Sequence, residues 1–141
     1  MVEEALVIYR ELGNLFATAD SLSGLGSHYR ALGDREAATA AQREALEMFV
    51  EVGNPTGIAM VLEEMAMIET MDGRHERALR LAGAADALKD QIGGGAPAEL
   101  MRSGESLEES RRSLDPGTAE RAWDEGREMS TDKAIAYALE S

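Results

Sequence analysis

Apolar side chains recur every three or four residues along most of this chain, in segments that end at glycines. Such spacing puts the apolar side chains on one face of an α-helix. The pattern predicts helices over residues 3–12, 15–32, 35–52, 55–71 and 75–92. Three side chains that can accept a hydrogen bond and cap a helix stand just before these segments: Asn14, Asp34 and Asn54.

The same pattern returns after 40 residues. Two sets of glycines mark this period, Gly13, Gly53 and Gly93, and midway between them Gly33 and Gly73. A fixed period of this size is typical of stacked helical hairpins, in which one unit cannot bury its own apolar face. We therefore expect an all-α fold, an α-α superhelix of helical hairpins over residues 1–95. Arrays of this kind usually bind partners and seldom catalyse reactions.

The repeat ends at the glycine- and proline-containing stretch 93–97. Beyond it the pattern predicts one helix over 98–114, a second that starts at Asp115-Pro116, and a last one capped by Ser130. We expect these segments, within residues 96–141, to be capping helices that pack on the array and give it a polar outer end. The whole chain is then one domain.

Charge and composition narrow the classes of partner. The chain has 27 acidic and 14 basic residues, a net charge of −13, so nucleic acid and anionic membranes are poor partners. It has no cysteine, which excludes disulfides and thiolate sites. No long apolar run and no signal-peptide pattern is present, and a cytoplasmic location is the expectation.

Candidate chemistry is sparse. His28 and His75 lie in different units without carboxylates at ligand spacing, so we expect no metal site. Serines cluster within residues 103–113, but no histidine is expected beside them to act as a base. Residues 93–95 lack the Lys-Ser/Thr that follows a phosphate-binding loop. The sequence therefore predicts no enzyme and no cofactor.

Two further features favour structural roles. Adjacent acidic residues on a helix point about 100° apart, so we expect solvated faces rather than a joint site at three pairs: Glu3-Glu4, Glu63-Glu64 and Glu108-Glu109. Trp123, a lone indole among alanines, is expected to anchor its helix on the neighbours rather than stack a ligand.

The first complete hairpin carries small and large residues in the order that tetratricopeptide repeats use for packing: Leu22, Leu25, Gly26, Tyr29, Gly33, Ala38, Ala45 and Leu46. On these residues the chain resembles the tetratricopeptide-repeat family. The second unit is a diverged copy, because Glu69 stands where the family has an aromatic residue. The period of 40 also exceeds the ~34 residues usual for the family.

Longer units of this type resemble the C-terminal sensor arrays of bacterial signalling ATPases and multidomain transcriptional regulators, including maltose-regulator-like, LuxR-like helix-turn-helix and cyclase-like proteins. The segment 122–139 looks like the ending of such regulators. The resemblance implies that this chain is the C-terminal regulatory part of a larger protein, and it brings no catalytic residue with it.

In tetratricopeptide arrays the first helix of each hairpin lines a concave groove. The resemblance therefore implies a groove for a protein, a peptide or a small effector at these positions: Asp20, Ser23, Ser27, Arg30, Met60, Glu63, Met67, Thr70 and Met71. The three methionines replace Asp, Ser and Ala of the first unit, and flexible thioethers suit an irregular apolar partner. The alternative is that these methionines pack against the C-terminal helices as core.

A second hypothesis is self-association. The chain opens within a second arm, so its first helix lacks a partner and exposes an apolar edge at Ile8, Tyr9 and Leu12. Such an edge suits a two-fold dimer. A free-standing adaptor is a further alternative to the regulator.

Overall fold

The computed structural model describes residue 4 and residues 14–93 and 107–140. The expected helix over 3–12, its apolar edge at Ile8, Tyr9 and Leu12, and the first part of the expected helix over 98–114 lie outside the described residues. Within the described part, every regular element is an α-helix, which confirms the all-α fold class.

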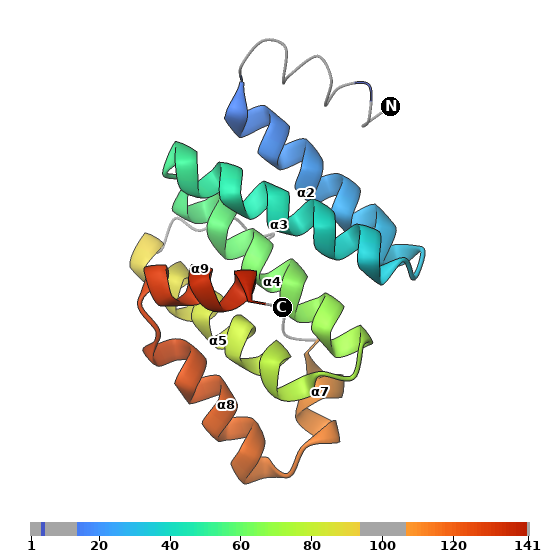
Figure 1. Cartoon of the computed structure of the whole chain (residues 1–141). Helices are drawn as coiled ribbons and strands as arrows, with labels where there is room; N and C mark the ends of the chain where they lie inside the picture. The colour runs from blue at the N-terminus through green and yellow to red at the C-terminus, as the bar shows by residue number, and fades with distance from the viewer. Residues whose placement is uncertain (1–3, 5–13, 94–106, 141) are drawn as a thin grey trace.

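Two helical hairpins follow one another along the chain (Figure 1). The first consists of α2 (Leu15–Ala31) and α3 (Arg35–Val52), and the second of α4 (Pro55–Met71) and α5 (His75–Ile92). Each helix of the second hairpin begins 40 residues after its counterpart and has the same length. The 40-residue period of the sequence is therefore a period of the structure.

Three of these four helices begin at the capping residues that the sequence predicts. The Asn14 side chain accepts from the Ala17 amide at 3.0 Å, Asp34 accepts from Ala37 at 3.1 Å, and Asn54 accepts from Gly57 at 2.8 Å. These bonds satisfy amides that the first turn of a helix leaves without a partner. The fourth helix, α5, has no side-chain cap.

The turns within the two hairpins have the same geometry. Gly33 and Gly73 adopt φ values of 81° and 79°, a left-handed conformation that glycine adopts without steric cost. Each turn closes with a 2.9 Å hydrogen bond to the carbonyl five residues earlier, from the amide of Asp34 in one hairpin and Arg74 in the other. Matching turns give the two hairpins the same local path.

A large apolar core joins the hairpins to the C-terminal segment. It contains the buried Leu46, Leu62 and Leu81 of the hairpins together with Leu107 and Ala138. Within the first hairpin, the fully buried Gln42 side chain donates to the Ser23 carbonyl at 2.9 Å and accepts from the Ser23 hydroxyl at 3.0 Å. This polar pair fixes α2 against α3 because both groups would lose water on burial.

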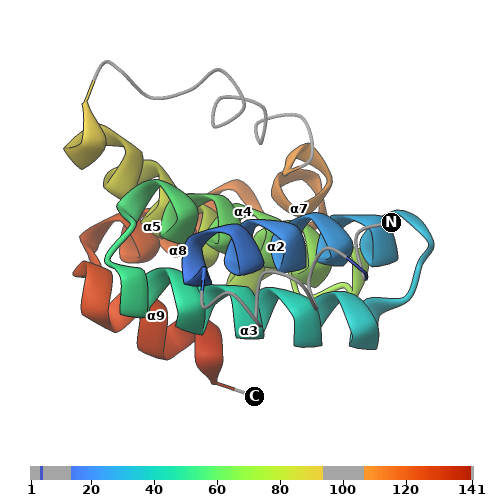
Figure 2. The ribbon, with the colours of Figure 1, turned by 90° about the horizontal axis from the view of Figure 1, so that it is seen from above.

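Three shorter helices follow within the described residues 107–140: α7 (Glu108–Ser113), α8 (Pro116–Glu128) and α9 (Thr131–Leu139). The caps expected at Asp115 and Ser130 are both formed. α8 lies along α5, while α9 lies on the side of α3 and α7 on the side of α2 and α4 (Figures 1 and 2). The three C-terminal helices therefore cover the second hairpin on three sides.

Candidate functional site

Three of the expected groove residues are buried inside the fold. Ser23, Glu63 and Thr70 are each only 6% exposed and make contacts between helices. The prediction that these three side chains line an accessible groove is therefore wrong, because each of them is buried against a partner on a neighbouring helix.

The remaining predicted groove residues keep some exposure. Asp20 is exposed and Ser27 is half-buried, and Met71 is 45% exposed. Arg30 and Met67 are half-buried, and Arg30 forms a 3.0 Å ion pair with Glu64. We call Asp20, Ser27, Arg30, Met67 and Met71 the α2–α4 face.

Met60, the other predicted methionine, packs against the apolar core and is half-buried. Met60 therefore fits the alternative hypothesis, in which these methionines are core residues. Met71 does not, since nearly half of its side chain faces solvent. The methionines of α4 thus divide between the two interpretations.

The Glu63-Glu64 pair is not a solvated face, contrary to the sequence prediction. Glu63 is buried and forms an ion pair with Lys89 of α5, and Glu64 pairs with Arg30 of α2. Desolvation lowers the pKa of Lys89 below its ordinary value. The two adjacent carboxylates thus point to different helices and join α4 to both neighbours.

Glu69 organises the other side of α4. Its carboxylate contacts Arg77 at 3.0 Å and Arg74 at 3.2 Å, and the side chains of Glu69 and Arg77 are both 12% exposed. In the sequence, Glu69 is notable only because tetratricopeptide repeats have an aromatic residue at this position. The two arginines that compensate it, Arg74 just before α5 and Arg77 on α5, occupy positions held by Asp34 and Ala37 in the first hairpin.

The arginines of this side also hold the end of α9. Arg77 donates to the carbonyls of Tyr137 and Glu140 at 3.0 Å, and its guanidinium lies 4.6 Å from the Tyr137 ring centre. Arg43 of α3 donates to the Leu139 carbonyl at 2.6 Å. Cations at a helix C-terminus stabilise its unpaired carbonyls and its dipole.

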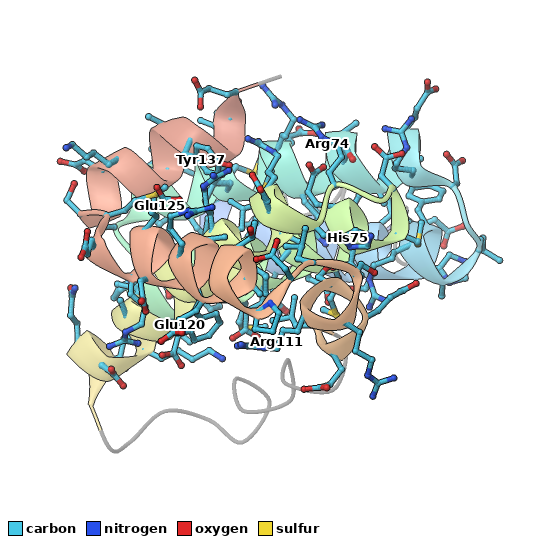
Figure 3. All side chains as sticks on the ribbon, turned by 90° about the horizontal axis from the view of Figure 1, so that it is seen from below. Arg74, His75, Arg111, Glu120, Glu125 and Tyr137 are labelled. Carbon is cyan, nitrogen blue, oxygen red and sulfur yellow. The ribbon has the colours of Figure 1, made fainter. Side chains whose placement is uncertain are left out.

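Arg80 joins both of the last helices to α5. It contacts the Glu125 carboxylate of α8 at 3.1 Å and the Tyr137 hydroxyl of α9 at 3.4 Å; Figure 3 labels these two partner residues. The hydrogen bond with Tyr137 raises the pKa of Arg80. The guanidinium therefore stays charged and bridges the cap to the array.

These contacts surround a cleft of about 260 Å³ between α3, the start of α5 and the end of α9. We call it the arginine cleft, and its lining residues are Arg35, Thr39, Arg43, Met65, Glu69, Arg74, Arg77, Leu81, Ala138 and Glu140. In Figure 3, Arg74 and Tyr137 lie on this side of the molecule, where α9 packs. The expected groove lies on the first helix of each hairpin, whereas this cleft is lined by the second helices, by the end of α9 and by Met65 and Glu69 of α4.

A histidine does lie beside a serine of the 103–113 cluster, contrary to the sequence prediction. His75 Nδ1 is 2.9 Å from the Ser110 hydroxyl, which is itself 2.7 Å from the Thr70 hydroxyl. Ser110 is fully buried. The contact joins α5, α7 and α4.

The direction of the hydrogen bonds argues against a catalytic pair. Thr70 donates its only hydroxyl proton to the Ala66 carbonyl, so the Ser110 hydroxyl must donate to Thr70. Ser110 must then accept from His75, whose Nδ1 carries a proton. A histidine that donates to the serine cannot remove its proton, so the chain of bonds is a structural link between helices.

Trp123 meets the expectation of an anchor. Its half-buried ring packs against the apolar core, and the Arg111 guanidinium lies 4.8 Å from the ring centre. Arg111, Ala119 and Trp123 also line a shallow surface depression. The Arg111 guanidinium therefore occupies one face of the ring.

Within residues 4, 14–93 and 107–140, no group of three or more histidine, aspartate or glutamate side chains could hold a metal ion. No helix of that part is long and apolar enough to cross a membrane. Comparison with protein-family models, with curated proteins and with solved structures gives no match.

Proposed function

We propose that this chain is a non-enzymatic interaction module that receives a protein or peptide partner on its α2–α4 face. The observation that carries the proposal is the exposure of Met71, whose side chain is 45% exposed beside the half-buried Met67 one turn earlier. The first hairpin has Ala31 and Ser27 at these positions, so the packing common to both hairpins does not require methionine. Flexible thioethers at a surface adapt to an irregular apolar partner.

The use of the charged residues supports a binding rather than a catalytic role. Glu63, Glu69 and Arg77 are each taken up by contacts that hold helices together. Ser110, whose hydroxyl bonds to His75, is buried and accepts from that histidine. Contacts between helices account for each of these groups, so none of them needs a role in a reaction.

The repeat supports a proposal about the larger protein to which this array belongs. Two hairpins with equal helix lengths and matching turns are consistent with a tetratricopeptide-like superhelix, closed by α7, α8 and α9. We propose that this array is the C-terminal regulatory part of a cytoplasmic bacterial transcriptional regulator or signalling ATPase.

A photo-crosslinking amino acid at position 71 tests the partner face in cells that contain the protein. Val50 of α3 is a matched control position, because it is apolar and 41% exposed but lies on the other helix of the first hairpin. The proposal expects one dominant protein adduct from position 71 and none of that mass from position 50. Equal adducts from both positions, or none from position 71, would contradict it.

Self-association is a second candidate, favoured by a separate apolar patch. Phe16 at the start of α2 is 48% exposed, and Val52, the last residue of α3, is 41% exposed. The Phe16 ring also contacts Phe49 of α3, with centres 6.0 Å apart, so the two helix ends lie together. Sedimentation equilibrium tests this candidate: a dimer that Val52→Glu dissociates supports it, and a monomer at high concentration excludes it.

A further inference from the structure

We propose that α9 is a latch, which detaches and unfolds as one unit while the hairpins and α8 stay folded. α9 lies at the outside of the molecule, across α3 and α5 (Figure 1). It packs on the opposite side from α7 (Figure 2), so the latch is independent of the α2–α4 face.

The end of α9 is held through its backbone carbonyls. Arg77 donates to the carbonyls of Tyr137 and Glu140 at 3.0 Å. Arg43 donates to the Leu139 carbonyl at 2.6 Å. The last carbonyls of a helix have no partner within the helix, and water can take the place of the arginines when α9 leaves. Detachment therefore leaves no carbonyl of this end buried and unpaired.

The two arginines of α5 beneath α9 keep acidic partners after it leaves. Arg77 pairs with Glu69 of α4 at 3.0 Å. Arg80 pairs with Glu125 of α8 at 3.1 Å. Because neither carboxylate belongs to α9, its detachment leaves neither cation unpaired. An uncompensated buried charge is what makes most buried ionic contacts costly to break.

The apolar attachment of α9 is small. Its buried side chains are those of Ala134 and Ala138. Three larger side chains pack on the core but are only partly buried: Ile135, Tyr137 and Leu139. α5, in comparison, buries eight of its 18 residues, three of them leucines. Since stabilisation by apolar burial grows with the area removed from water, α9 is held more weakly than the hairpins.

α8 is attached differently and should stay in place. Its Arg127 forms an ion pair with Asp90 of α5 at 2.8 Å, so removing α8 would separate charges that α9 does not share. Met129 and Ser130 connect α8 to α9, and both have an extended backbone. Met129 packs against the apolar core. We therefore place the hinge of the latch at these two residues.

The length of α9 makes its detachment an unfolding step. It has nine residues, and isolated helices shorter than ~12–15 residues are marginal in water. The released segment therefore loses its helix and gains conformational entropy, which favours opening. Ala138 shares the lining of the arginine cleft with the fully buried Leu81, so opening extends this cleft down to an apolar floor.

Cysteine labelling tests the latch, because the chain has no cysteine of its own. Ala138→Cys places a thiol on α9, and Ala122→Cys on α8 and Ala45→Cys on α3 are matched controls. The three alanines are 0%, 1% and 0% exposed, so all three thiols are hidden in the closed form. We expect Ellman's reagent to label position 138 at least ~10-fold faster than positions 122 and 45 in native buffer, because a local opening is more frequent than global unfolding.

Amide hydrogen exchange of the unchanged protein gives a second measurement, which no substitution can disturb. The amides of α9 should exchange faster than those of α5 and respond weakly to low urea, because a local opening exposes less surface than global unfolding. Three results would overturn the proposal: equal labelling at positions 138 and 45, equal labelling at positions 138 and 122, or the same urea dependence of exchange in α9 and α5.

Discussion

Gly83 of α5 and Gly126 of α8 bring two helix backbones into direct contact. A methyl group at Gly83 would overlap the Trp123 carbonyl oxygen, and one at Gly126 would overlap the Arg80 carbonyl oxygen. Both glycines are buried where α8 packs against α5 (Figure 1). Direct backbone contact at these two glycines is therefore part of what attaches α8 to α5.

Substituting Gly83→Ala should destabilise the protein by about 1–3 kcal/mol, because the two backbones would have to separate. Gly24→Ala is the control, since a methyl group at Gly24 on α2 meets nothing within 4 Å. Alanine there should stabilise the helix by about 0.5–1 kcal/mol. Urea unfolding measures both, and equal stability of the two variants would contradict the close contact.

Arg77 should carry much of the attachment of α9. Arg77→Ala removes its bonds to the α9 carbonyls and leaves the largely buried Glu69 with only the more exposed Arg74 as an ionic partner. We expect a loss of about 2–4 kcal/mol, somewhat below the cost of breaking a fully buried pair. Hydrogen exchange should show α9 losing protection first. Arg121→Ala, at an exposed position of α8, should leave exchange in α9 unchanged.

The bond between Ser110 and His75 predicts a specific tautomer. Because Ser110 accepts from His75, the neutral imidazole should carry its proton on Nδ1 instead of the commoner Nε2. Nitrogen-15 shifts of the His75 ring at alkaline pH measure this directly. A ring protonated on Nε2 would reverse the deduced direction and reopen the question of a base.

The same link has an energetic consequence. Ser110→Ala leaves the His75 donor without its buried acceptor and should cost about 1–3 kcal/mol. Ser113→Ala on the same helix is the control, because the exposed Ser113 hydroxyl bonds only to the nearby Glu109 carbonyl. A similar stability of the two variants would mean that the link contributes little.

The local elements could be predicted from the sequence because their signals are local. Asn14, Asp34 and Asn54-Pro55 begin helices through bonds that reach three residues ahead, and Gly33 and Gly73 end them through their own φ values. The 40-residue period then orders these signals into hairpins.

The arginine cleft could not be predicted, because its contacts join distant residues. Arg77 and the Tyr137 carbonyl are 60 residues apart, and Arg43 and the Leu139 carbonyl are 96 apart. Neither pair carries a spacing or periodicity that a single sequence reveals. The burial of Glu63 could not be predicted for the same reason. An acidic pair on a helix is usually solvated, and only the position of Lys89 on α5 explains why Glu63 is buried.

Lys89 predicts how this buried ion pair responds to pH. Desolvation lowers its pKa in the folded protein, so between that value and its ordinary 10.5 the unfolded chain binds more protons than the folded one. The contribution of Lys89 to the free energy of unfolding therefore rises with pH over this window. The ε-carbon resonance of Lys89 should titrate at lower pH in the folded protein than in urea. Titration at the same or a higher pH would contradict this.

The partner face is the central claim, and Met71→Glu tests it most directly. The measurement is the Kd for the protein captured by the crosslinker at position 71, compared with Val50→Glu, an equivalent change at a similarly exposed side chain. We predict that Met71→Glu raises Kd at least ~10-fold with helicity unchanged, and that Val50→Glu leaves it within twofold. Equal Kd values for both variants and the unchanged protein would contradict a binding site on the α2–α4 face.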